Sequence, residues 1–133
     1  MTLVDSTIIL DIATNDPRWA DWSQFQLERA TLAGPLVIND IIYADVSVRY
    51  ELIEDLDAAL DTLETRLEAM PREALFLAAK VYRQYRARGG TRTGMLSDFF
   101  IGAHAAVADY TLLTRDPGRY RSCFPTVRLI LPD

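Results

Sequence analysis

The chain has 133 residues, of which half are hydrophobic, and it carries a formal net charge of −5 with a pI of about 4.8. This acidic balance argues against a protein that coats nucleic acid, because such proteins present a basic surface. No stretch approaches the roughly 18 consecutive apolar residues of a membrane span, and the single cysteine, Cys123, excludes an internal disulfide and a thiolate zinc site.

Strand and helix signals alternate from the first residues. Residues 2–5 (TLVD) are an apolar run that ends in an acid, which predicts a buried strand. Ser6 or Thr7 can then cap a short helix through the apolar residues that follow. A proline in the first turn and a glycine at the end predict another helix over residues 15–34.

A second strand and two further helices follow. Residues 35–38 (PLVI) predict the strand, and Asn39 or Asp40 can cap a helix over the stretch DIIYADVSVRYELIED, in which two valines weaken the helical pattern. Residues 55–70 carry leucines at spacings of four, three and four, which predicts an amphipathic helix over that whole range.

The remaining elements complete an alternating pattern. Residues 71–88 begin with proline and predict a helix, and residues 97–109 predict an apolar, buried helix. Two strands are predicted, over residues 110–114 and 127–131. Because helices separate the strands, we expect an α/β fold with a parallel sheet of about four to five strands flanked by helices on both faces. The length fits a single domain over residues 1–133.

Three acidic residues stand where such a sheet gathers functional groups. Asp5 and Asp116 follow strands, and Asp98 begins a helix, so all three are expected at one edge of the sheet. Like charges about 4 Å apart repel by roughly 4 kcal/mol at an effective dielectric of 20, so the carboxylates share either protons or a cation. Oxygen ligands without histidine or cysteine suit Mg²⁺ or Mn²⁺.

Each acid also has a structural explanation when it is considered alone. A helix dipole favours Asp98, Asp116 suits a turn before a Pro-Gly pair, and Asp5 can cap a helix. Their expected convergence favours a shared cation over three separate structural roles.

Three segments resemble the PIN-domain family, and more closely its VapC-like toxin ribonucleases. They are LVDST at residues 3–7, DFFIGAHA at residues 98–105 and LLTRD at residues 112–116. The resemblance extends over almost the whole chain. It implies a parallel sheet sandwiched by helices, an acidic pocket that holds Mg²⁺ or Mn²⁺, and hydrolysis of RNA phosphodiester bonds.

The resemblance also implies roles for individual residues. Asp5, Asp98 and Asp116 match the family's metal-site acids, and Thr7 and Thr114 stand where the family often has a supporting hydroxyl. One position departs from the pattern. Asp45 occupies the place of the usual glutamate and is one methylene shorter, so we expect it to act as a fourth catalytic acid, either directly on the metal or through water. Glu51 is a poorer substitute, because its offset of six residues points it elsewhere on the helix.

Arginines near these acids are candidates for contacts with RNA phosphates, with tyrosines available to stack on bases. The predicted RNA-binding residues are Arg86, Arg88, Arg92 and Arg115. The alternative for residues 82–94 is a solvated helix end whose cations suit the helix dipole. Arg115 either contacts a phosphate or neutralises its neighbour Asp116.

The resemblance further implies a cognate antitoxin and a homodimer. The N-terminus is apolar and acidic rather than basic, so we expect a cytoplasmic protein with no signal peptide and no membrane partner.

The alternative function is a catalytically weak PIN-fold module that acts by binding, which Asp45 in place of glutamate supports. A haloacid-dehalogenase-type phosphotransferase needs an aspartate two residues after Asp5, where this chain has Thr7. His104 lies off the helix face of Asp98 and is interpreted as a structural or surface residue.

Overall fold

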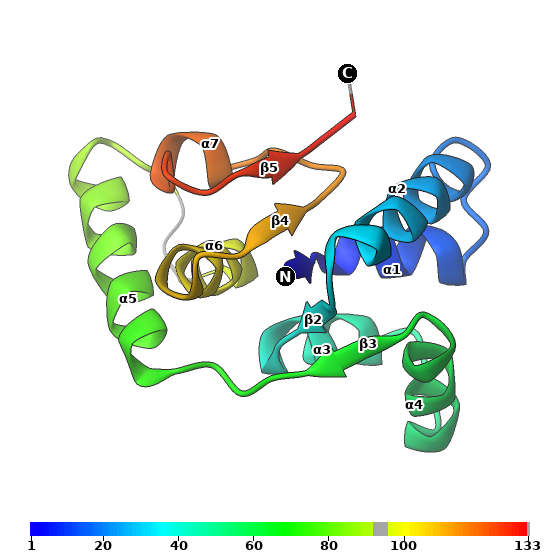
Figure 1. Cartoon of the computed structure of the whole chain (residues 1–133). Coiled ribbons are helices and arrows are strands. Elements are labelled where there is room, and N and C mark those ends of the chain that lie inside the picture. The colour runs from blue at the N-terminus through cyan, green and yellow to red at the C-terminus, as the bar shows by residue number, and fades with distance from the viewer. Residues whose placement is uncertain (92–95, 133) are drawn as a thin grey trace.

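The computed structural model describes residues 1–91 and 96–132. Within this part of the chain, five strands form one parallel sheet in the order β3-β2-β1-β4-β5 (Figure 1). The strands are β1 (Thr2–Val4), β2 (Leu36–Ile38), β3 (Thr65–Leu67), β4 (Thr111–Leu113) and β5 (Leu129–Ile130). The first strand of the sequence therefore lies at the centre of the sheet, between β2 and β4.

Helices cover the sheet from two sides. They are α1 (Ser6–Ala13), α2 (Ala20–Ala33), α3 (Asp40–Ser47), α4 (Ile53–Thr62), α5 (Arg72–Ala87), α6 (Ser97–Ala108) and α7 (Tyr120–Cys123). In Figure 1, α1 and α2 lie to one side of the row of strands, and α5 and α6 lie to the other. The predicted parallel α/β sandwich is confirmed.

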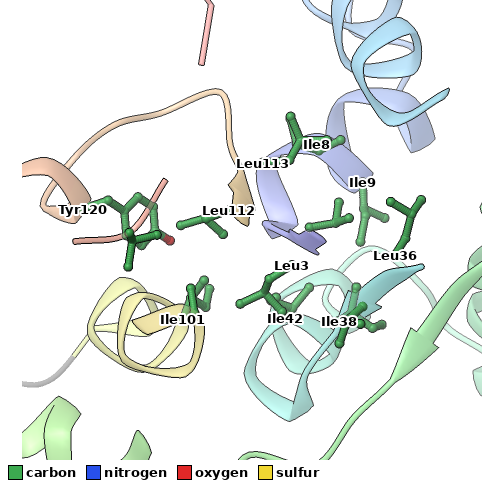
Figure 2. Packing of buried hydrophobic residues seen from close by; sticks show 14 of the residues in the cluster. Leu3, Ile8, Ile9, Leu36, Ile38, Ile42, Ile101, Leu112, Leu113 and Tyr120 are labelled. Carbon is green, nitrogen blue, oxygen red and sulfur yellow. The ribbon is translucent and has the colours of Figure 1, made fainter. Parts of the chain in front are cut away.

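The centre of the sheet is buried on both faces, as the near-continuous apolar strands require. Figure 2 shows Leu3 between Ile101 of α6 and Ile42 of α3, whereas Leu113 lies beside Ile8 of α1. All five of these side chains are completely buried. Removing each from water contributes roughly 1.5–3 kcal/mol to the free energy of folding.

The register of the central strands fixes the position of the residues that follow them. Val4 pairs with Leu113 at the carboxyl ends of β1 and β4. The backbone N–H of Asp5 then donates to the carbonyl of Leu113 at 2.9 Å. Asp5 and Thr114 consequently leave the sheet side by side.

A close approach joins α6 to the segment after α7. A Cβ atom on Gly102 would lie 2.3 Å from the ring of Phe124, so only glycine allows this ring to pack against the helix. Phe124 is buried, and this contact holds the C-terminal segment against α6.

The predicted helix over residues 55–70 is wrong in its second half. Helix α4 ends at Thr62, Glu64 adopts a left-handed backbone with φ of 58°, and the chain then enters β3. β3 pairs in parallel with β2, with Leu67 opposite Ile38. Backbone pairing with an exposed sheet edge outweighs the leucine spacing, and Leu67 is exposed rather than packed in the core.

Two other helix predictions extend too far. The stretch DIIYADVSVRYELIED divides into α3 and the start of α4, because Tyr50 donates its N–H to the Ser47 carbonyl and turns the chain. The helix expected over residues 15–34 begins at Ala20, because the Asp16 carboxylate accepts the N–H groups of the two residues after Pro17 and forms a turn.

In the described ranges, no helix combines the length and hydropathy that crossing a membrane requires.

Candidate acidic site

Asp5 lies at the carboxyl end of β1 and is almost completely buried, at 4% exposure. Its Oδ1 accepts the backbone N–H of Ser6 at 2.8 Å, which caps the N-terminus of α1. Its Oδ2 accepts the hydroxyl of Thr114 at 2.6 Å and that of Thr7 at 3.4 Å. Both threonines that were predicted to support the site therefore contact Asp5.

Asp45 lies in the last turn of α3. Asn39 caps the N-terminus of this helix by accepting the N–H of Ile42 at 2.9 Å. The Asp45 Oδ1 atom accepts the hydroxyl of Ser97 at 2.9 Å. Its Oδ2 atom accepts the hydroxyl of Ser6 at 3.3 Å. Ser6 also contacts Asp5, so a single hydroxyl links these two acids.

Asp98 lies in the first turn of α6, where the helix dipole favours a negative charge. Its Oδ2 atom pairs with the guanidinium Nη1 of Arg119 at 2.8 Å. Its Oδ1 atom is buried and finds no hydrogen-bond partner among the described residues. A buried carboxylate oxygen without a donor is costly, so this atom marks a position where a cation or a donor fits.

Asp116 belongs to the loop after β4. Its Oδ1 atom accepts the N–H of Gly118 at 3.0 Å, and its backbone N–H donates to the hydroxyl of Thr114 at 3.2 Å. A Cβ atom on Gly118 would lie within 4 Å of carboxylate oxygens of both Asp116 and Asp98. These two acids thus approach each other across Gly118.

The four acids line one pocket of about 170 Å³. Ser6, Thr7, Ser97, Ile101, Gly118 and Tyr120 complete its wall. The sheet topology therefore brings together all four acids that the sequence singled out, although their roles in catalysis and metal binding stay predictions.

Burial dominates the electrostatics of the pocket. It raises the pKa of Asp5 above its usual range, although hydrogen bonds from three neighbours act in the opposite direction. Tyr120 is 3% exposed, and burial raises the pKa of its hydroxyl, with the charge of Asp5 as the next cause. Tyr120 therefore stays protonated beside the acids and can donate a hydrogen bond to Asp5.

The donor set fits a hard divalent cation, because it consists of carboxylates and hydroxyls and includes an unpartnered buried Asp98 oxygen. The carboxylates are nevertheless spread around the pocket wall. Within the described part of the chain, no three acidic, histidine or cysteine side chains are close enough together to form a metal cage by themselves. Since Mg²⁺ keeps several of its waters, it can be held by such a wall partly through water.

Arg115 is engaged elsewhere than the sequence suggested. Its Nε and Nη2 atoms donate to the two carboxylate oxygens of Asp11 at 2.7 and 2.9 Å, rather than to its neighbour Asp116. Asp11 also accepts the hydroxyl of Ser23, and the Arg115 guanidinium lies over the ring of Trp19. Arg115 thus joins the loop after β4 to α1 and α2, and its contact with RNA stays a prediction.

The other predicted RNA-binding arginines lie at the C-terminal end of α5 and beyond. Arg86 and Arg88 are exposed, and Arg86 donates to the carbonyl of Gly90 at 3.1 Å. Arg92 lies outside the described residues.

Sequence reasoning missed Arg119, which pairs with Asp98 of the pocket, and also Tyr120 and Ser97, which line the pocket. Their only signal was position: two follow Asp116 closely, and the third precedes Asp98. His104 is fully buried and does not line the pocket; its Nδ1 lies 3.0 Å from the side-chain nitrogen of Asn39. This contact agrees with a structural role for His104.

Comparison with known proteins gives a family and a set of similar folds. The sequence model of the PIN domain matches residues 2–124. No curated protein matches the sequence at a significant level.

The solved structures with similar folds include three from bacteria. VapBC2 from Rickettsia felis, bound to a DNA fragment from its promoter, has a TM-score of 0.77 at 17% identity, over 99% of this chain and 98% of that chain. FitAcB from Neisseria gonorrhoeae has a TM-score of 0.67 at 18% identity, over 98% and 96% of the two chains. VapBC-1 from nontypeable Haemophilus influenzae has a TM-score of 0.69 at 15% identity, over 97% and 96%. At these identities the similarity establishes the fold.

Proposed function

Because the chain belongs to the PIN domain family, we propose that it is a Mg²⁺- or Mn²⁺-dependent endoribonuclease and the toxin of a toxin–antitoxin pair. The proposal includes one PIN domain over residues 1–133 and a cytoplasmic location. The observation that supports it most is the pocket in which four carboxylates from four different elements meet.

In this proposal, Asp5, Asp98 and Asp116 hold the metal, and Asp45 contributes directly or through water. When bound, the metal supplies a water molecule of lowered pKa and offsets the negative charge that develops on the phosphoryl oxygens. The unpartnered oxygen of Asp98 and the all-oxygen character of the pocket support this assignment.

Neighbouring hydroxyl groups orient these acids. Thr114 and Thr7 direct one oxygen of Asp5, and Ser97 directs one oxygen of Asp45. Such neighbouring hydrogen bonds typically change metal affinity or activity by 10–100-fold when they are lost. Tyr120 is a buried residue of the pocket lining and keeps its proton there.

RNA is proposed to approach over the C-terminal half of α5. Arg83 and Arg86 are exposed on this helix, and Arg88 is exposed directly after its end. Tyr85 of the same helix packs on Phe99 of α6, next to Asp98. In this proposal the exposed arginines contact RNA phosphates while the scissile bond lies at the pocket. Arg115 and Arg92 complete the proposed RNA-binding set.

An antitoxin partner and a homodimer are also part of the proposal. The solved structures of similar fold include a toxin–antitoxin complex from Klebsiella pneumoniae. Phe25 and Leu32 on α2 are large apolar side chains that remain exposed, which supports a protein partner on that helix. Light scattering that finds only monomer at tens of micromolar would contradict the homodimer.

The decisive experiment compares RNA cleavage by purified wild-type protein, Asp98→Asn and Asp109→Asn in Mn²⁺ and in excess chelator. Asp109 lies at the other end of α6 with its side chain in solvent, so Asp109→Asn is a matched control. We expect cleavage to fall at least about 100-fold in Asp98→Asn and to remain in Asp109→Asn. Undiminished cleavage by Asp98→Asn would remove this mechanism.

The alternative is a PIN-fold module that acts by binding alone. Asp45 in place of glutamate supports it, as does the absence of a ready three-ligand cage among the described side chains. A titration that finds no Mn²⁺ binding, together with RNA binding that a chelator leaves unchanged, would favour this alternative.

A further inference from the structure

We propose that Arg119 is the resident counter-ion of the acidic pocket, which holds the Asp98 carboxylate in the absence of a divalent cation and competes with that cation for Asp98. The inference rests on the proposed function of the pocket as a metal site. It makes Arg119 a positioning residue that sets the metal affinity of the pocket.

The ion pair itself is direct and largely shielded from water. The Arg119 Nη1 atom lies 2.8 Å from the Asp98 Oδ2 atom, and the two side chains are 23% and 18% exposed. At such a separation and with so little water, a charge-assisted hydrogen bond is strong and orients both groups. Arg119 therefore fixes the rotamer of Asp98 in the structure.

The guanidinium has supports other than Asp98. It lies over the ring of Tyr85 at 5.3 Å and over the ring of Phe99 at 5.8 Å. A hydrogen bond with Tyr85, followed by the one with Asp98, raises the pKa of Arg119 above its usual range. These contacts keep a permanent positive charge at the pocket even when Asp98 turns to another partner.

The pair is incomplete in a way that a purely structural ion pair is not. Arg115 and Asp11 in the same chain form two hydrogen bonds that occupy both carboxylate oxygens. Arg119 makes a single bond to Asp98, and both its Nε atom and the Asp98 Oδ1 atom are buried with no hydrogen-bond partner in the described part of the chain. One oxygen of Asp98 is therefore paired while the other lacks a hydrogen-bond partner among the described residues. This arrangement suits a ligand that exchanges one positive partner for another.

The competition has a definite sign. A divalent cation that enters the pocket meets the charge of Arg119 as well as those of the acids, so Arg119 opposes its binding. Replacing Arg119 by a neutral residue removes this repulsion and releases Asp98. The neutral variants should therefore bind Mn²⁺ about tenfold more tightly or better, although the metal-free protein loses stability because Asp98 remains charged and unpaired.

The test is calorimetric titration of Mn²⁺ into metal-free wild type, Arg119→Gln, Arg119→Met, Arg119→Lys and Arg121→Gln at one ionic strength. Arg119→Met keeps apolar contact with Tyr85 and Phe99, and it serves as the second neutral variant if Arg119→Gln does not fold. Arg121→Gln removes the same charge from an exposed position of α7 and controls for net charge. Thermal unfolding in chelator and in Mn²⁺ provides a second measurement that does not depend on activity.

The expected result is a dissociation constant about tenfold lower in the neutral Arg119 variants, with Arg119→Lys and Arg121→Gln within about threefold of wild type. Mn²⁺ should also raise the melting temperature of the neutral variants more than that of wild type. If both neutral variants bind Mn²⁺ no more tightly than wild type does, the inference is overturned and the proposed function remains. If neither wild type nor any variant binds Mn²⁺, the metal site fails and the inference with it.

Discussion

Thr114 donates its hydroxyl to Oδ2 of Asp5 at 2.6 Å and so joins the carboxyl ends of β4 and β1 across 109 residues of sequence. The same hydroxyl accepts the backbone N–H of Asp116. One side chain therefore sets both the orientation of Asp5, the most buried of the four pocket acids, and the path of the loop that carries Asp116.

Replacing Thr114 by valine should weaken the site while keeping the shape of the core. The buried Asp5 oxygen and the part-buried Asp116 N–H each lose a partner, which should lower the free energy of unfolding by about 1–3 kcal/mol. Mn²⁺ affinity and RNA cleavage should fall by about 10–100-fold. Urea unfolding, Mn²⁺ titration and a cleavage assay measure these effects. Thr114→Ser keeps the hydroxyl and should stay near wild type in all three, and equal losses in both variants would contradict this role.

Asp5→Asn should stabilise the metal-free protein at neutral pH while abolishing cleavage. Because burial raises the pKa of Asp5, the folded state holds its proton at pH values where the unfolded state has already lost it. The stability of the fold therefore decreases as pH rises from the ordinary carboxyl range through the raised pKa, and this decrease is the cost of ionising Asp5 in the fold. Asparagine removes this cost and can keep the hydrogen bonds with Ser6 and Thr114. We expect a gain of roughly 0.5–2 kcal/mol by urea unfolding, the usual size of such trade-offs.

A decrease in stability of Asp5→Asn at pH 7 would show that the hydrogen bonds of the ionised carboxylate outweigh its burial. The gain should shrink when the same comparison is made in saturating Mn²⁺, because wild type then gains binding energy that the variant lacks.

Asp45 offers a test of side-chain length against charge. Asp45→Asn keeps the length and can still accept the hydroxyl of Ser97, yet it removes the charge, so cleavage should fall by about 10–100-fold. Asp45→Glu keeps the charge and lengthens the side chain toward the pocket, so it should retain cleavage within about tenfold of wild type. Cleavage rates at saturating Mn²⁺ provide the measurement. Equal activity of Asp45→Asn and wild type would exclude Asp45 from the machinery.

His104 should make stability depend on pH. Burial lowers the pKa of His104, with opposing contributions from Glu68 and Asp40. A histidine that is neutral in the fold and protonated in the unfolded chain stabilises fully above its ordinary pKa near 6.5, and this contribution is lost as pH falls below that value through the lowered pKa. His104→Gln lacks this titration. The free energy of unfolding of wild type and of His104→Gln is measured in urea from pH 7.5 to pH 5, and the difference between them should narrow as pH falls. Parallel pH dependences of the two proteins would contradict the lowered pKa of His104.

The central strands were predictable because parallel strands buried on both faces are short apolar runs, and TLV, LVI and TLL carry that signal without interruption. β3 was not, because Thr65, Arg66 and Leu67 form a partly polar edge strand that only pairing with β2 makes extended. The breaks after Thr62 and Ser47 come from turns whose hydrogen bonds depend on the tertiary path rather than on periodicity.

The convergence of the acids could be inferred because parallel topology puts strand ends and helix starts at one edge, a rule that needs no side-chain detail. The partners of those acids could not. Arg119 reaches Asp98 across 21 residues, and Ser97 reaches Asp45 across 52, and no local pattern reports such pairs. The expected pairing of Arg115 with Asp116 was wrong for the same reason: Asp116 is its neighbour in sequence, but its partner in space is Asp11.

The dispersal of the pocket along the chain has a consequence for biosynthesis. Asp5 is translated 109 residues before Thr114, and Asp116 and Tyr120 follow Thr114 in the sequence. Until then β1 lacks its β4 neighbour, and a growing chain cannot assemble the set of carboxylates. If the pocket attacks RNA as proposed, the ribosome and message that produce it are not exposed to a formed pocket until the chain has been translated beyond Tyr120.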